Sequence, residues 1–567
     1  MWTFSVEAFG DPYLSWRHAV SRKIEAGQGA ADLVNELAEG AAMLEQAAEI
    51  VPAKFQAWVL SAAAALRDDG RPLFARVGSA FDLAELLWEY PLRQLVTASP
   101  GYEIWVDRQR ALFSAWYEIF PRSEGAEPGV HGTFATAARC LPEVAQMGFD
   151  VLYLTPIHPI GRINRKGRNN ALVAEPGDVG SPYAIGAAEG GHDAIHPELG
   201  TMEDFREFVA GAKRAGLEVA MDLALQCAPD HPWVTEHPQW FTTRADGHIA
   251  YAENPPKKYE DIYPLNFDND PDGIRQEVLR IVMHWVQQGV KIFRVDNPHT
   301  KPVSMWHWLI WQVKQADPDV LFLAEAFTTP AMMHGLAKAG FTQSYTYFTW
   351  RNAAAEMRRY CEELVDAADY MRPNFWPTTP DILTPDLQFG GPAMFKIRAV
   401  LASMLSPSWG IYAGYELFEH VARAGVEEHV DNEKYELKPR DRAAARAAGE
   451  SLAPFLAKLN AIRRHNPALH WLRNLHFHDV DNDALLCWSK RDPGSGNTML
   501  VVCSFDPSHE QWASATLDMA ALGFEAHQRF TVRDELTGSE YQWGDRNIVG
   551  LNPHVEPAHI FTVHRHD

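Results

Sequence analysis

The stretch from Gly289 to His299 reads GVKIFRVDNPH and decides the fold prediction for this chain. In it an apolar, strand-like run ends in one acid, Asp296, with Arg294 two positions earlier. The run VLFLAEAF then ends in Glu325, and the segment PTTPDIL carries Asp381. The helix-like segment SMWHWLIWQVK separates the first two acids, as expected for consecutive βα units of a barrel, whose functional groups gather at the carboxyl ends of the strands.

Strand-like and helix-like segments alternate on both sides of this stretch. The strand-like segments are, in chain order, FDVLYLTPI, LEVAMDLAL, VKIFRVD, VLFLAEAF, SYTYFTW, NFWPTTPDI and WGIYAGYELFE. Such alternation indicates a parallel sheet, and roughly eight strands in about 360 residues predict an α/β fold built on a (β/α)₈ barrel. An Ala-, Leu- and Glu-rich region with helical periodicity precedes it and predicts an N-terminal helical domain. Short alternating strands after Leu475 predict a C-terminal antiparallel β-sandwich.

These patterns divide the chain into three predicted domains. Residues 1–110 form the mainly helical domain, residues 111–475 the catalytic barrel, and residues 476–567 the β-sandwich. Two loops, around residues 160–200 and 226–265, are predicted insertions in the barrel.

Composition restricts the partners and the compartment. The formal charge of −23 argues against nucleic acid or an anionic membrane as the main partner, because basic surfaces bind both. The five cysteines are widely spaced and form no C-x-x-C pair, so neither a disulfide framework nor a zinc site is predicted. No apolar run approaches the ~20 residues of a membrane span. The expected location is therefore the cytoplasm.

Each of the three acids also has a purely structural interpretation. Asp296 and Arg294 could be an ion pair at a strand end, Glu325 could cap a helix, and Asp381 could belong to a turn. Their joint placement at three strand ends favours catalysis instead. Two carboxyl groups on either side of one scissile bond carry out glycosyl transfer.

Two loops rich in cations suggest an anionic group on the substrate. The loop HPIGRINRKGRNN, which we expect to follow the first barrel strand, carries Arg162, Arg165, Lys166 and Arg168. The segment NPPKKYEDIYP offers Asn254, Lys257, Lys258 and Tyr259. Such runs are usually solvated, but on a protein this acidic two of them at the functional face of a barrel suggest a phosphate site.

The histidines and aromatic residues give weaker signals. His192, Asp193 and His196 could suggest a metal, but no metal-ligand spacing of the HExxH or CxxC type is present, so we predict no metal and no cofactor. Near the ends of the early strands, Trp116, Tyr117 and Tyr153 are the candidates for stacking on a sugar.

Long segments of the chain resemble the α-amylase superfamily of retaining glycosidases, and within it the α-1,4-glucan:maltose-1-phosphate maltosyltransferases. The segments that carry the resemblance are AWYEIFPRS, YLTPIHPIGRINRKGRNN, EGGHDAIHPELGT, DLALQCAPDHPWV, AENPPKKYEDIYPLNFD, FRVDNPHTKP, AEAFTTP, FTQSYTYFTWRN, TTPDIL and DNEKYE. It extends from about residue 5 to the C-terminus.

The resemblance implies roles for particular residues. It implies Asp296 as nucleophile, Glu325 as general acid/base and Asp381 as transition-state stabiliser. The substrate-binding residues that it implies around the donor and its phosphate, with Arg294 added to them, are Lys166, Gln226, Asn254, Lys257, Tyr259, Asp261, Asn297, Lys434 and Tyr435. The Asn-His-Asp that amylases commonly have at the third acid is Thr379-Pro380-Asp381 here, so the usual histidine contact to the sugar is absent.

The resemblance also implies the partners. The expected donor is α-maltose 1-phosphate and the expected acceptor an α-1,4-glucan. Family members carry an additional N-terminal β-sandwich that contributes to a homodimer, whereas this chain starts at what resembles its last strand, WTFSVEAF. We therefore expect only remnant strands of a truncated sandwich, and a homodimer stays open.

The predicted function is transfer of maltosyl units to the non-reducing end of an α-1,4-glucan with release of phosphate. One alternative is an α-glucan hydrolase or transglycosylase acting on neutral oligosaccharides, which would not need two lysine-bearing loops. Another is a non-catalytic glucan-binding protein, which would have no use for all three acids.

Overall fold

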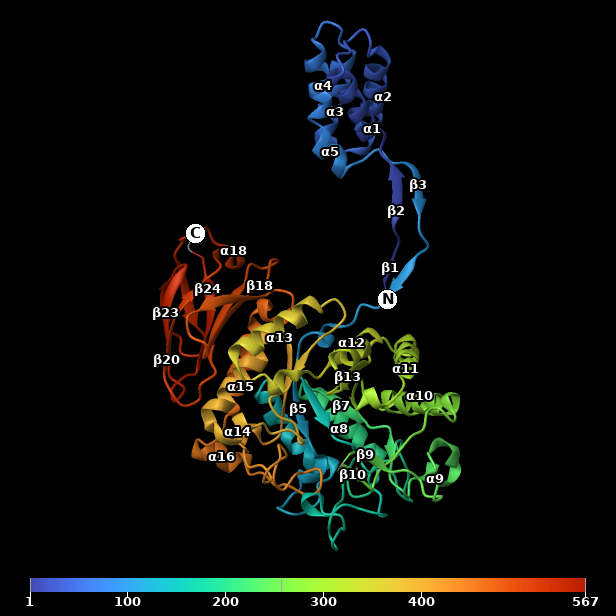
Figure 1. Ribbon diagram of the computed structural model, residues 1–567, viewed down its shortest axis with the longest axis vertical. Coiled ribbons are helices and arrows are strands. Elements are labelled where there is room, and N and C mark those ends of the chain that lie inside the picture. The colour runs from blue at the N-terminus through green and yellow to red at the C-terminus, as the bar shows by residue number, and fades with distance from the viewer. Residues whose placement is uncertain (1, 256, 566–567) are drawn as a thin grey trace. The chain divides into compact units, whose positions relative to one another are not determined.

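The structure is a computed structural model that describes residues 2–255 and 257–565 of the chain, without the side chains of Asn254 and Lys257. The chain divides into two compact units, Met1–Val106 and Asp107–Asp567 (Figure 1). No helix within the described ranges is long and apolar enough to cross a membrane.

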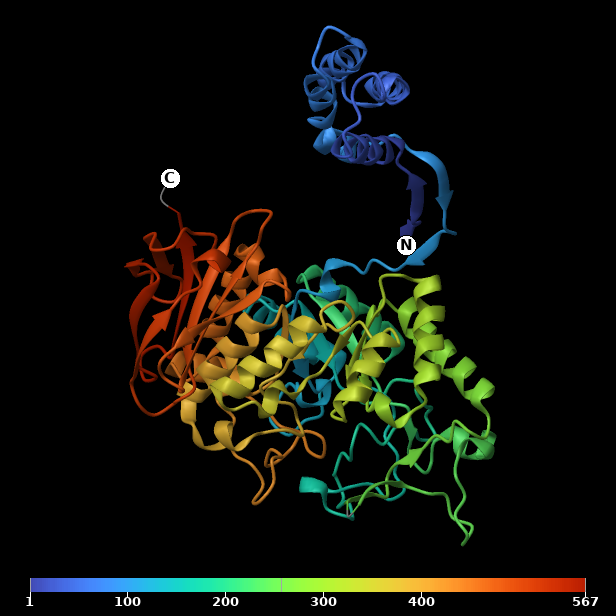
Figure 2. The ribbon, with the colours of Figure 1, turned by 45° about the horizontal axis from the view of Figure 1, so that its top comes forward.

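The first unit consists of five helices and a two-stranded ribbon (Figure 2). Its ribbon brings the start and the end of the unit together, because β1 (Trp2–Phe4) pairs with β4 (Tyr102–Ile104) and β2 (Glu7–Gly10) pairs with β3 (Gln94–Ala98). The helices between them are α1 (Pro12–Glu25), α2 (Val34–Ile50), α3 (Ala53–Arg67), α4 (Leu73–Phe81) and α5 (Ala84–Glu89). Their apolar faces share one core, which confirms the predicted helical region.

The second unit contains the predicted (β/α)₈ barrel. Its strands are β5 (Ser114–Ile119), β6 (Val151–Leu154), β7 (Glu218–Leu223), β12 (Ile292–Asp296), β13 (Leu321–Glu325), β14 (Gln343–Ser344), β15 (Asn374–Phe375) and β16 (Ser408–Tyr412). They form one parallel sheet in the order β14-β13-β12-β7-β6-β5-β16-β15. A single parallel bridge between Ser344 and Pro373 joins β14 to the segment before β15 and closes the barrel.

Helices follow the strands and cover them. They are α6 (Phe134–Ala137), α7 (Leu141–Gln146), α8 (Met202–Arg214), α10 (Pro271–Gln287), α11 (Val303–Ala316), α12 (Pro330–Lys338), α13 (Ala354–Asp366), α14 (Pro385–Phe389), α15 (Gly391–Leu405), α16 (Arg442–Ala448) and α17 (Ala453–His465). The α11 helix lies between β12 and β13 in the chain, as the sequence pattern predicted. Its apolar side packs into the large core of the unit.

Two strand predictions need correction. The segment SYTYFTW is a strand only at its start, because β14 ends at Ser344 and Tyr347–Trp350 form a 3₁₀ helix. There the main-chain N–H of Tyr347 donates to the hydroxyl of Tyr360 in α13, at 3.0 Å, so a side chain replaces the next strand as its partner. The basic loop follows β6, the second barrel strand and not the first, because β5 precedes it.

Two insertions lie at the carboxyl ends of the strands and pack against each other. The first follows β6, and the second follows β7 and contains β8 (Gln226–Cys227), α9 (Pro232–Glu236), β9 (Ala252–Asn254), β10 (Lys257–Tyr259) and β11 (Tyr263–Pro264). The pairs β8–β11 and β9–β10 are antiparallel. Tyr183 and Ile185 of the first insertion share a buried cluster with Ile262 of the second, which holds the two loops together over the barrel.

An antiparallel eight-stranded sheet ends the chain, as predicted. Its strands are β17 (Leu475–Val480), β18 (Leu485–Arg491), β19 (Thr498–Ser504), β20 (Gln511–Thr516), β21 (Phe530–Asp534), β22 (Glu540–Trp543), β23 (Arg546–Leu551) and β24 (Ala558–His564), with α18 (Met519–Leu522) after β20. One face of this sheet contributes to the core of the barrel unit. All five cysteines are buried and free.

The first prediction concerns Gly410 in β16. A Cβ atom at this position would lie 2.5 Å from Trp376, a side chain that is 1% exposed and stacked on Tyr345 at 5.2 Å. Gly410→Ala should therefore lower the free energy of unfolding by about 1–3 kcal/mol, because the indole has no free space into which to move. Chemical denaturation of the barrel unit measures this change.

Gly335 in α12 is the matched control. A Cβ atom there meets nothing within 4 Å, so Gly335→Ala should raise the free energy of unfolding by roughly 0.5–1 kcal/mol. Equal effects of the two substitutions would contradict the contact assigned to Gly410.

Candidate active site

One buried guanidinium connects three carboxyl groups at the carboxyl ends of neighbouring strands. Arg294, in β12, donates from Nη1 to Asp296 Oδ1 at 2.9 Å and to Asp222 Oδ2 of β7 at 3.1 Å. Its Nη2 lies 3.4 Å from Glu325 Oε1 at the end of β13. Asp296 and Glu325 are direct neighbours in the parallel ladder. Because Arg294 contacts both Asp296 and Glu325, their carboxyl groups lie close enough together to contact the same small chemical group.

The backbone turns sharply immediately after Asp296. Asn297 has φ 43° and ψ 55°, a left-handed conformation that Asn tolerates better than most residues. In this conformation its main-chain N–H donates to Glu325 Oε2 at 3.2 Å, and its side-chain Nδ2 lies 3.5 Å from Asp296 Oδ2. The turn therefore contacts both carboxyl groups, as expected of a residue predicted to be in the site.

The environment gives these two acids opposite pKa shifts. Burial, together with the charges of Asp296 and Asp381, raises the pKa of Glu325 to about 7, although Arg294 and the N–H of Asn297 oppose the shift. Burial also acts against ionisation of Asp296, but Arg294 and nearby lysines outweigh it and hold its pKa below the ordinary value. At neutral pH the pair can thus present one carboxylate and one group poised to give or take a proton.

The third acid comes from a loop. Asp381 follows β15, has a half-exposed side chain and accepts from Lys434 Nζ at 3.0 and 3.2 Å. The same ammonium lies over the ring of Tyr183, 5.0 Å from its centroid. The Tyr183 hydroxyl donates to Asp222 Oδ2 at 3.0 Å, and its carbonyl accepts from Gln226 Nε2 at 3.2 Å. Tyr183 thereby links Lys434 and Gln226 to the group around Arg294.

Three further residues predicted to bind the substrate, Lys166, Asp261 and Tyr435, are buried. Lys166 is 2% exposed, and its ammonium pairs with Glu260 Oε2 at 2.5 Å. Asp261 is buried, which raises its pKa against the charges of Lys166 and Lys434. Tyr435 is also buried, and its pKa is raised by burial, with the charge of Asp381 acting in the same direction against that of Lys434.

Three predicted residues belong to the hairpin of the second insertion. Tyr259 is half-buried and packs against the cluster that contains Tyr183. Asn254 and Lys257 pair with each other through their main chains, and their side chains lie outside the described residues. No contact of their functional groups is therefore assigned.

The arginines of the basic loop are engaged within the protein. Arg162 pairs with Glu189, and Arg168 with Asp178. Arg165 donates to the main-chain carbonyls of Ile160 and Gly161. These contacts stay within the first insertion, whereas Lys166 reaches across to Glu260 of the second.

The aromatic candidates from the early strands are not sugar platforms. Trp116 is 1% exposed, and Tyr117 and Tyr153 are 0% exposed. The Tyr153 hydroxyl donates to Asp222 and the Tyr117 hydroxyl to Glu416. Trp116 and Tyr153 therefore belong to the interior of the barrel, and Tyr117 to the core on the other face of the sheet.

Several functional neighbours were missed from the sequence. Asp222 is the last residue but one of β7, in LEVAMDLAL, so the rule that found Asp296 could have found it. Tyr183 and Glu260 stand in loops without periodicity, where no such signal exists. Glu118, near the end of β5, is buried, which raises its pKa well above the ordinary value even though Arg294 acts against the shift.

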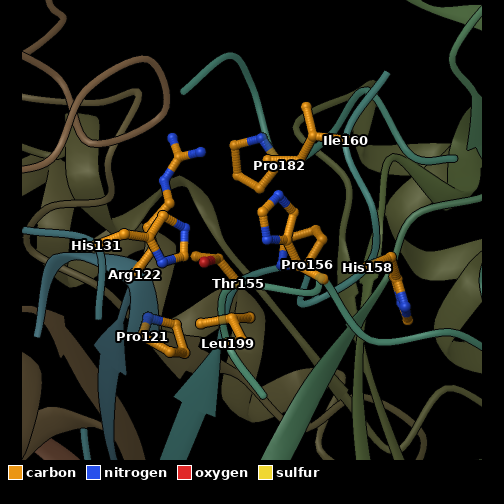
Figure 3. A pocket seen from close by; sticks show the side chains of 10 residues that line it. Pro121, Arg122, His131, Thr155, Pro156, His158, Ile160, Pro182 and Leu199 are labelled. Carbon is orange, nitrogen blue, oxygen red and sulfur yellow. The ribbon is translucent and has the colours of Figure 1, made fainter. Parts of the chain in front are cut away.

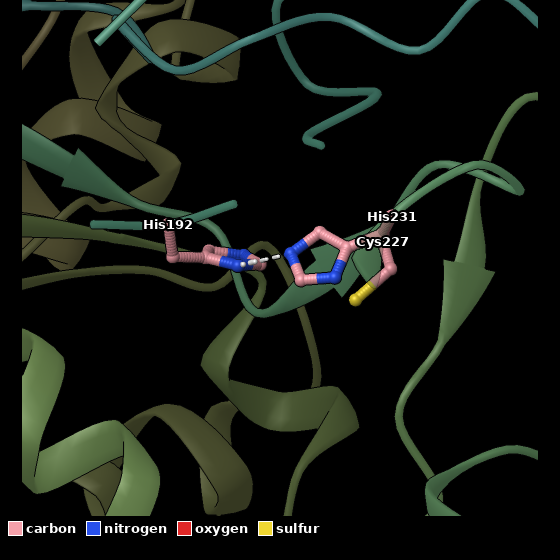
Figure 4. Close-up of side chains that lie close together, drawn as sticks. All are labelled: His192, Cys227 and His231. Carbon is pink, nitrogen blue, oxygen red and sulfur yellow. Dashed lines mark hydrogen bonds between the residues drawn. The ribbon is translucent and has the colours of Figure 1, made fainter. Parts of the chain in front are cut away.

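A buried histidine chain lies beside the site (Figure 4). His192 Nε2 lies 2.9 Å from the carbonyl of Ala224, so it carries the proton, and its Nδ1 accepts from His231 Nε2 at 3.2 Å. His231 Nδ1 in turn accepts from the main-chain N–H of Trp233 at 3.0 Å. Cys227 is close enough to complete a metal-ligand trio. A metal on His231 Nε2 would displace the proton that this atom donates to His192, so we interpret the histidine chain as a packing network.

A small cavity between the loops after β5 and β6 does not contain the acids. It measures about 10 Å³, and Figure 3 shows its lining, which includes Arg122, His131, Thr155 and Leu199. This is room for one water molecule and not for a sugar. The acid cluster around Arg294 is therefore the candidate active site.

Comparisons with known proteins match both ends of the chain to family models. A model described as "Alpha-1,4-glucan:maltose-1-phosphate maltosyltransferase, domain N/S" matches residues 1–108. A model described as "GLGE, C-terminal" matches residues 477–563.

Full-length relatives carry the same description. A protein of Mycolicibacterium smegmatis named alpha-1,4-glucan:maltose-1-phosphate maltosyltransferase is 60% identical over 99% of this chain and 82% of its own length. Its namesake from Mycobacterium tuberculosis is 58% identical over 99% of this chain and 81% of its own. One from Streptomyces coelicolor is 56% identical over 100% and 84%.

Among solved structures, α-amylases share the fold. A maltogenic α-amylase from Thermotoga neapolitana has a TM-score of 0.61 at 17% identity, over 81% of this chain and 99% of its own. An α-amylase from Lactobacillus plantarum has a TM-score of 0.58 at 19% identity, over 80% and 100%.

The second prediction concerns stability in acid. Burial lowers the pKa of His158 to about 3, of His192 to about 4 and of His231 to about 2, from an ordinary value of 6.5. These pKa values are lower in the folded protein than in the unfolded chain, so the three histidines do not reduce stability above pH 6.5. As the pH falls below 6.5, the unfolded chain binds protons that the folded protein does not, and the free energy of unfolding decreases. Below pH 6.5 each of these histidines should lower the free energy of unfolding by about 1.4 kcal/mol per pH unit.

Urea denaturation of the barrel unit at several pH values between 7.5 and 5 measures this slope. His231→Asn, whose side-chain oxygen can replace Nδ1 as acceptor for Trp233, should reduce the slope by about one histidine's share. The exposed His307→Asn serves as control and should keep the wild-type slope. If His231→Asn leaves the slope unchanged, the lowered pKa assigned to His231 is refuted.

Proposed function

We propose a residue-by-residue mechanism for this chain, which belongs to the α-1,4-glucan:maltose-1-phosphate maltosyltransferase family. The activity is transfer of maltosyl units from α-maltose 1-phosphate to the non-reducing end of an α-1,4-glucan, with release of phosphate and retention of the anomeric configuration. The single observation that supports the mechanism is the Arg294 cluster, in which two neighbouring carboxyl groups have opposite pKa shifts.

In the first half of the reaction Glu325 acts as general acid and Asp296 as nucleophile. Glu325, with a pKa of about 7, protonates the leaving phosphate oxygen, while ionised Asp296 attacks C1 of the donor. The C1–O bond to phosphate breaks and a β-maltosyl ester on Asp296 forms. The low pKa of Asp296 favours the ionised form that this attack needs.

In the second half Glu325 acts as base. It removes the proton from the acceptor 4-hydroxyl, whose oxygen attacks C1 and displaces Asp296, so two inversions give net retention. Asp381, held by Lys434, stabilises the positive charge that develops on the sugar in both steps. None of these steps requires a metal or an organic cofactor.

The substrate is bound by residues of the two insertions and of the loops after β12 and β16. We assign the donor sugar to Gln226, Asp261, Asn297, Lys434 and Tyr435, with Arg294 holding the acids in place. Asp261 Oδ1 is buried and has no hydrogen-bond partner among the described residues, so it can accept a sugar hydroxyl. We assign the donor phosphate to Lys166 with Asn254, Lys257 and Tyr259.

We extend the proposal to the organisation of the chain. The helical segment, residues 1–110, and the C-terminal sheet, residues 476–567, would support a barrel, residues 111–475, that carries the chemistry. The five free, buried cysteines support a reducing compartment such as the cytoplasm.

The decisive experiment compares two reactions of the wild-type protein. Phosphate should appear when it is mixed with α-maltose 1-phosphate and a short maltooligosaccharide, and reducing sugar should not appear from starch. Reducing sugar without phosphate would support the hydrolase instead, and neither product would support a glucan-binding protein.

The third prediction separates the roles of the two acids. Asp296→Ala should abolish transfer from every donor, because no ester can form. Glu325→Ala should still react with maltosyl fluoride, since fluoride leaves with less help from an acid, and should then stall as an ester on Asp296. Mass spectrometry of the intact protein detects the added maltosyl group. Normal turnover of Glu325→Ala with maltose 1-phosphate would exclude its role as the acid.

The fourth prediction concerns the phosphate. Lys166 supplies a charge-assisted hydrogen bond of ~1.5–3 kcal/mol, so Lys166→Met should lower kcat/KM for maltose 1-phosphate roughly 10- to 150-fold. Maltosyl fluoride lacks the phosphate, and its use should fall far less. Glu260→Gln removes the carboxylate that now pairs with Lys166 and should tighten donor binding.

The exposed Lys213→Met is the control for loss of one positive charge. It should leave steady-state kinetics with both donors unchanged. An equal loss with both donors for Lys166→Met would show that Lys166 acts on the sugar or on folding, and its assignment to the phosphate would be withdrawn.

A further inference from the structure

Lys301 lies directly behind the turn that carries Asp296. It follows a 3₁₀ helix over Pro298–Thr300, and its side chain reaches back along the chain. The ammonium donates to two consecutive main-chain carbonyls, that of Asp296 at 3.3 Å and that of Asn297 at 3.2 Å. These groups belong to the peptide units on either side of the left-handed residue.

The carbonyl oxygen of Asn297 accepts several hydrogen bonds that hold the turn. Besides Lys301, it accepts from the main-chain N–H of Thr300 at 3.2 Å and from the Thr300 hydroxyl at 2.8 Å. A left-handed conformation at a residue other than glycine costs of order 1 kcal/mol and persists only where surrounding contacts hold it. Three donors on one oxygen supply such contacts.

The conformation of Asn297 matters because of where its N–H points. That N–H donates to Glu325 Oε2, so the turn after β12 fixes the acid at the end of β13. A rotation of the turn would remove this bond and move Asp296 relative to Glu325. The distance between the two acids therefore depends on the peptide units that Lys301 holds.

The ammonium is also placed so that its charge acts on both acids. Burial lowers the pKa of Lys301, while Asp296 and Glu325 act in the opposite direction and favour its charged form. Its charge in turn contributes, after Arg294, to the low pKa of Asp296. The hydrogen bonds of Lys301 go to the main chain, so its ammonium occupies no carboxylate oxygen of Asp296 or Glu325.

We propose that Lys301 is a positioning residue, whose ammonium locks the left-handed turn at Asn297 and thereby sets the geometry and charge of the Asp296–Glu325 pair. This inference rests on the roles proposed above for those two acids. Lys301 does not have to touch the donor or the acceptor in order to act in this way.

The test is Lys301→Met, which has a side chain of similar length without the charge or the donors. A misplacement of about 1 Å in such a pair costs roughly 100-fold in rate, so kcat with maltose 1-phosphate should fall by about that factor. The KM for the donor should change much less, because the ammonium contacts only the main chain.

The pH profile of kcat/KM distinguishes positioning from a purely structural role. In the wild type the alkaline limb should lie near the Glu325 pKa of about 7. Loss of a nearby cation, and of the Asn297 N–H bond, favours protonated carboxyl groups, so both limbs should move up by about 0.5–1 pH unit in Lys301→Met. The other titratable groups near the pair, which all variants retain, are Tyr183, Asp222, Arg294, His299, Tyr345, Asp381 and Lys434.

A second variant and a chemical rescue keep the test decisive. Lys301→Gln retains a hydrogen-bond donor without the charge, so it should keep more of kcat than Lys301→Met and show a smaller shift of the limbs in the same direction, because only the charge is lost. Lys301→Cys treated with 2-bromoethylamine restores an ammonium at nearly the original length and should recover activity. The native cysteines are all buried, and treated wild-type protein is the control.

Two outcomes would overturn the proposal. One is a wild-type kcat and pH profile in Lys301→Met. The other is a loss of activity that follows only the loss of folded protein, with both limbs unmoved and no rescue. If Lys301→Met does not fold, the pH profile of Lys301→Gln decides. Failure of the wild type to release phosphate is a separate result, which would refute the proposed function and not the role of Lys301.

Discussion

A single buried cation organises the barrel. Arg294 contacts Asp222, Asp296 and Glu325, which come from three adjacent strands, and no other described side chain reaches all three. Removing one partner from such a network leaves a buried charge uncompensated, at a cost of about 3–5 kcal/mol. The same contacts determine which acid is ionised, because Arg294 opposes the upward shift of Glu325 less successfully than it lowers the pKa of Asp296. Stability and reactivity thus depend on one guanidinium.

Much of this arrangement could be predicted from the sequence. Asp296 and Glu325 each end an apolar run of strand length, and a helical segment separates them, so strand register alone places them side by side. Lys434 could not be paired with Asp381 by such reasoning, because 53 positions and two irregular loops separate them. The resemblance to a known family implied only that Lys434 lies near the donor. Local periodicity therefore predicts what strands position, and tertiary packing decides what loops contribute.

The errors of the sequence analysis have the same physical origin. The sequence predicts that aromatic residues at the ends of early strands stack on a sugar, although an eight-stranded barrel fills its interior with such side chains. Trp116 and Tyr153 are buried there, packed edge-on against Trp376. The basic loop offers fewer unpaired cations than its sequence suggests, because Arg162 pairs with Glu189 and Arg168 with Asp178 inside the same insertion. A sequence shows charges, and it does not show which of them are already paired.

The closure of the barrel has a consequence for how the protein can change. The strands that end in Asp296 and Glu325 pair along their whole lengths, whereas β14 and β15 are two residues long and are joined through one bridge, Ser344 to Pro373. The two short strands and their one bridge form a seam in the barrel, and Asp381 lies in the loop after β15. Amides near the seam should exchange with solvent sooner than those of β12 and β13. Substitutions there can also reshape the loop of Asp381 without disturbing the pair Asp296 and Glu325, so under the proposed mechanism sugar preference can evolve while the bond-forming chemistry is kept.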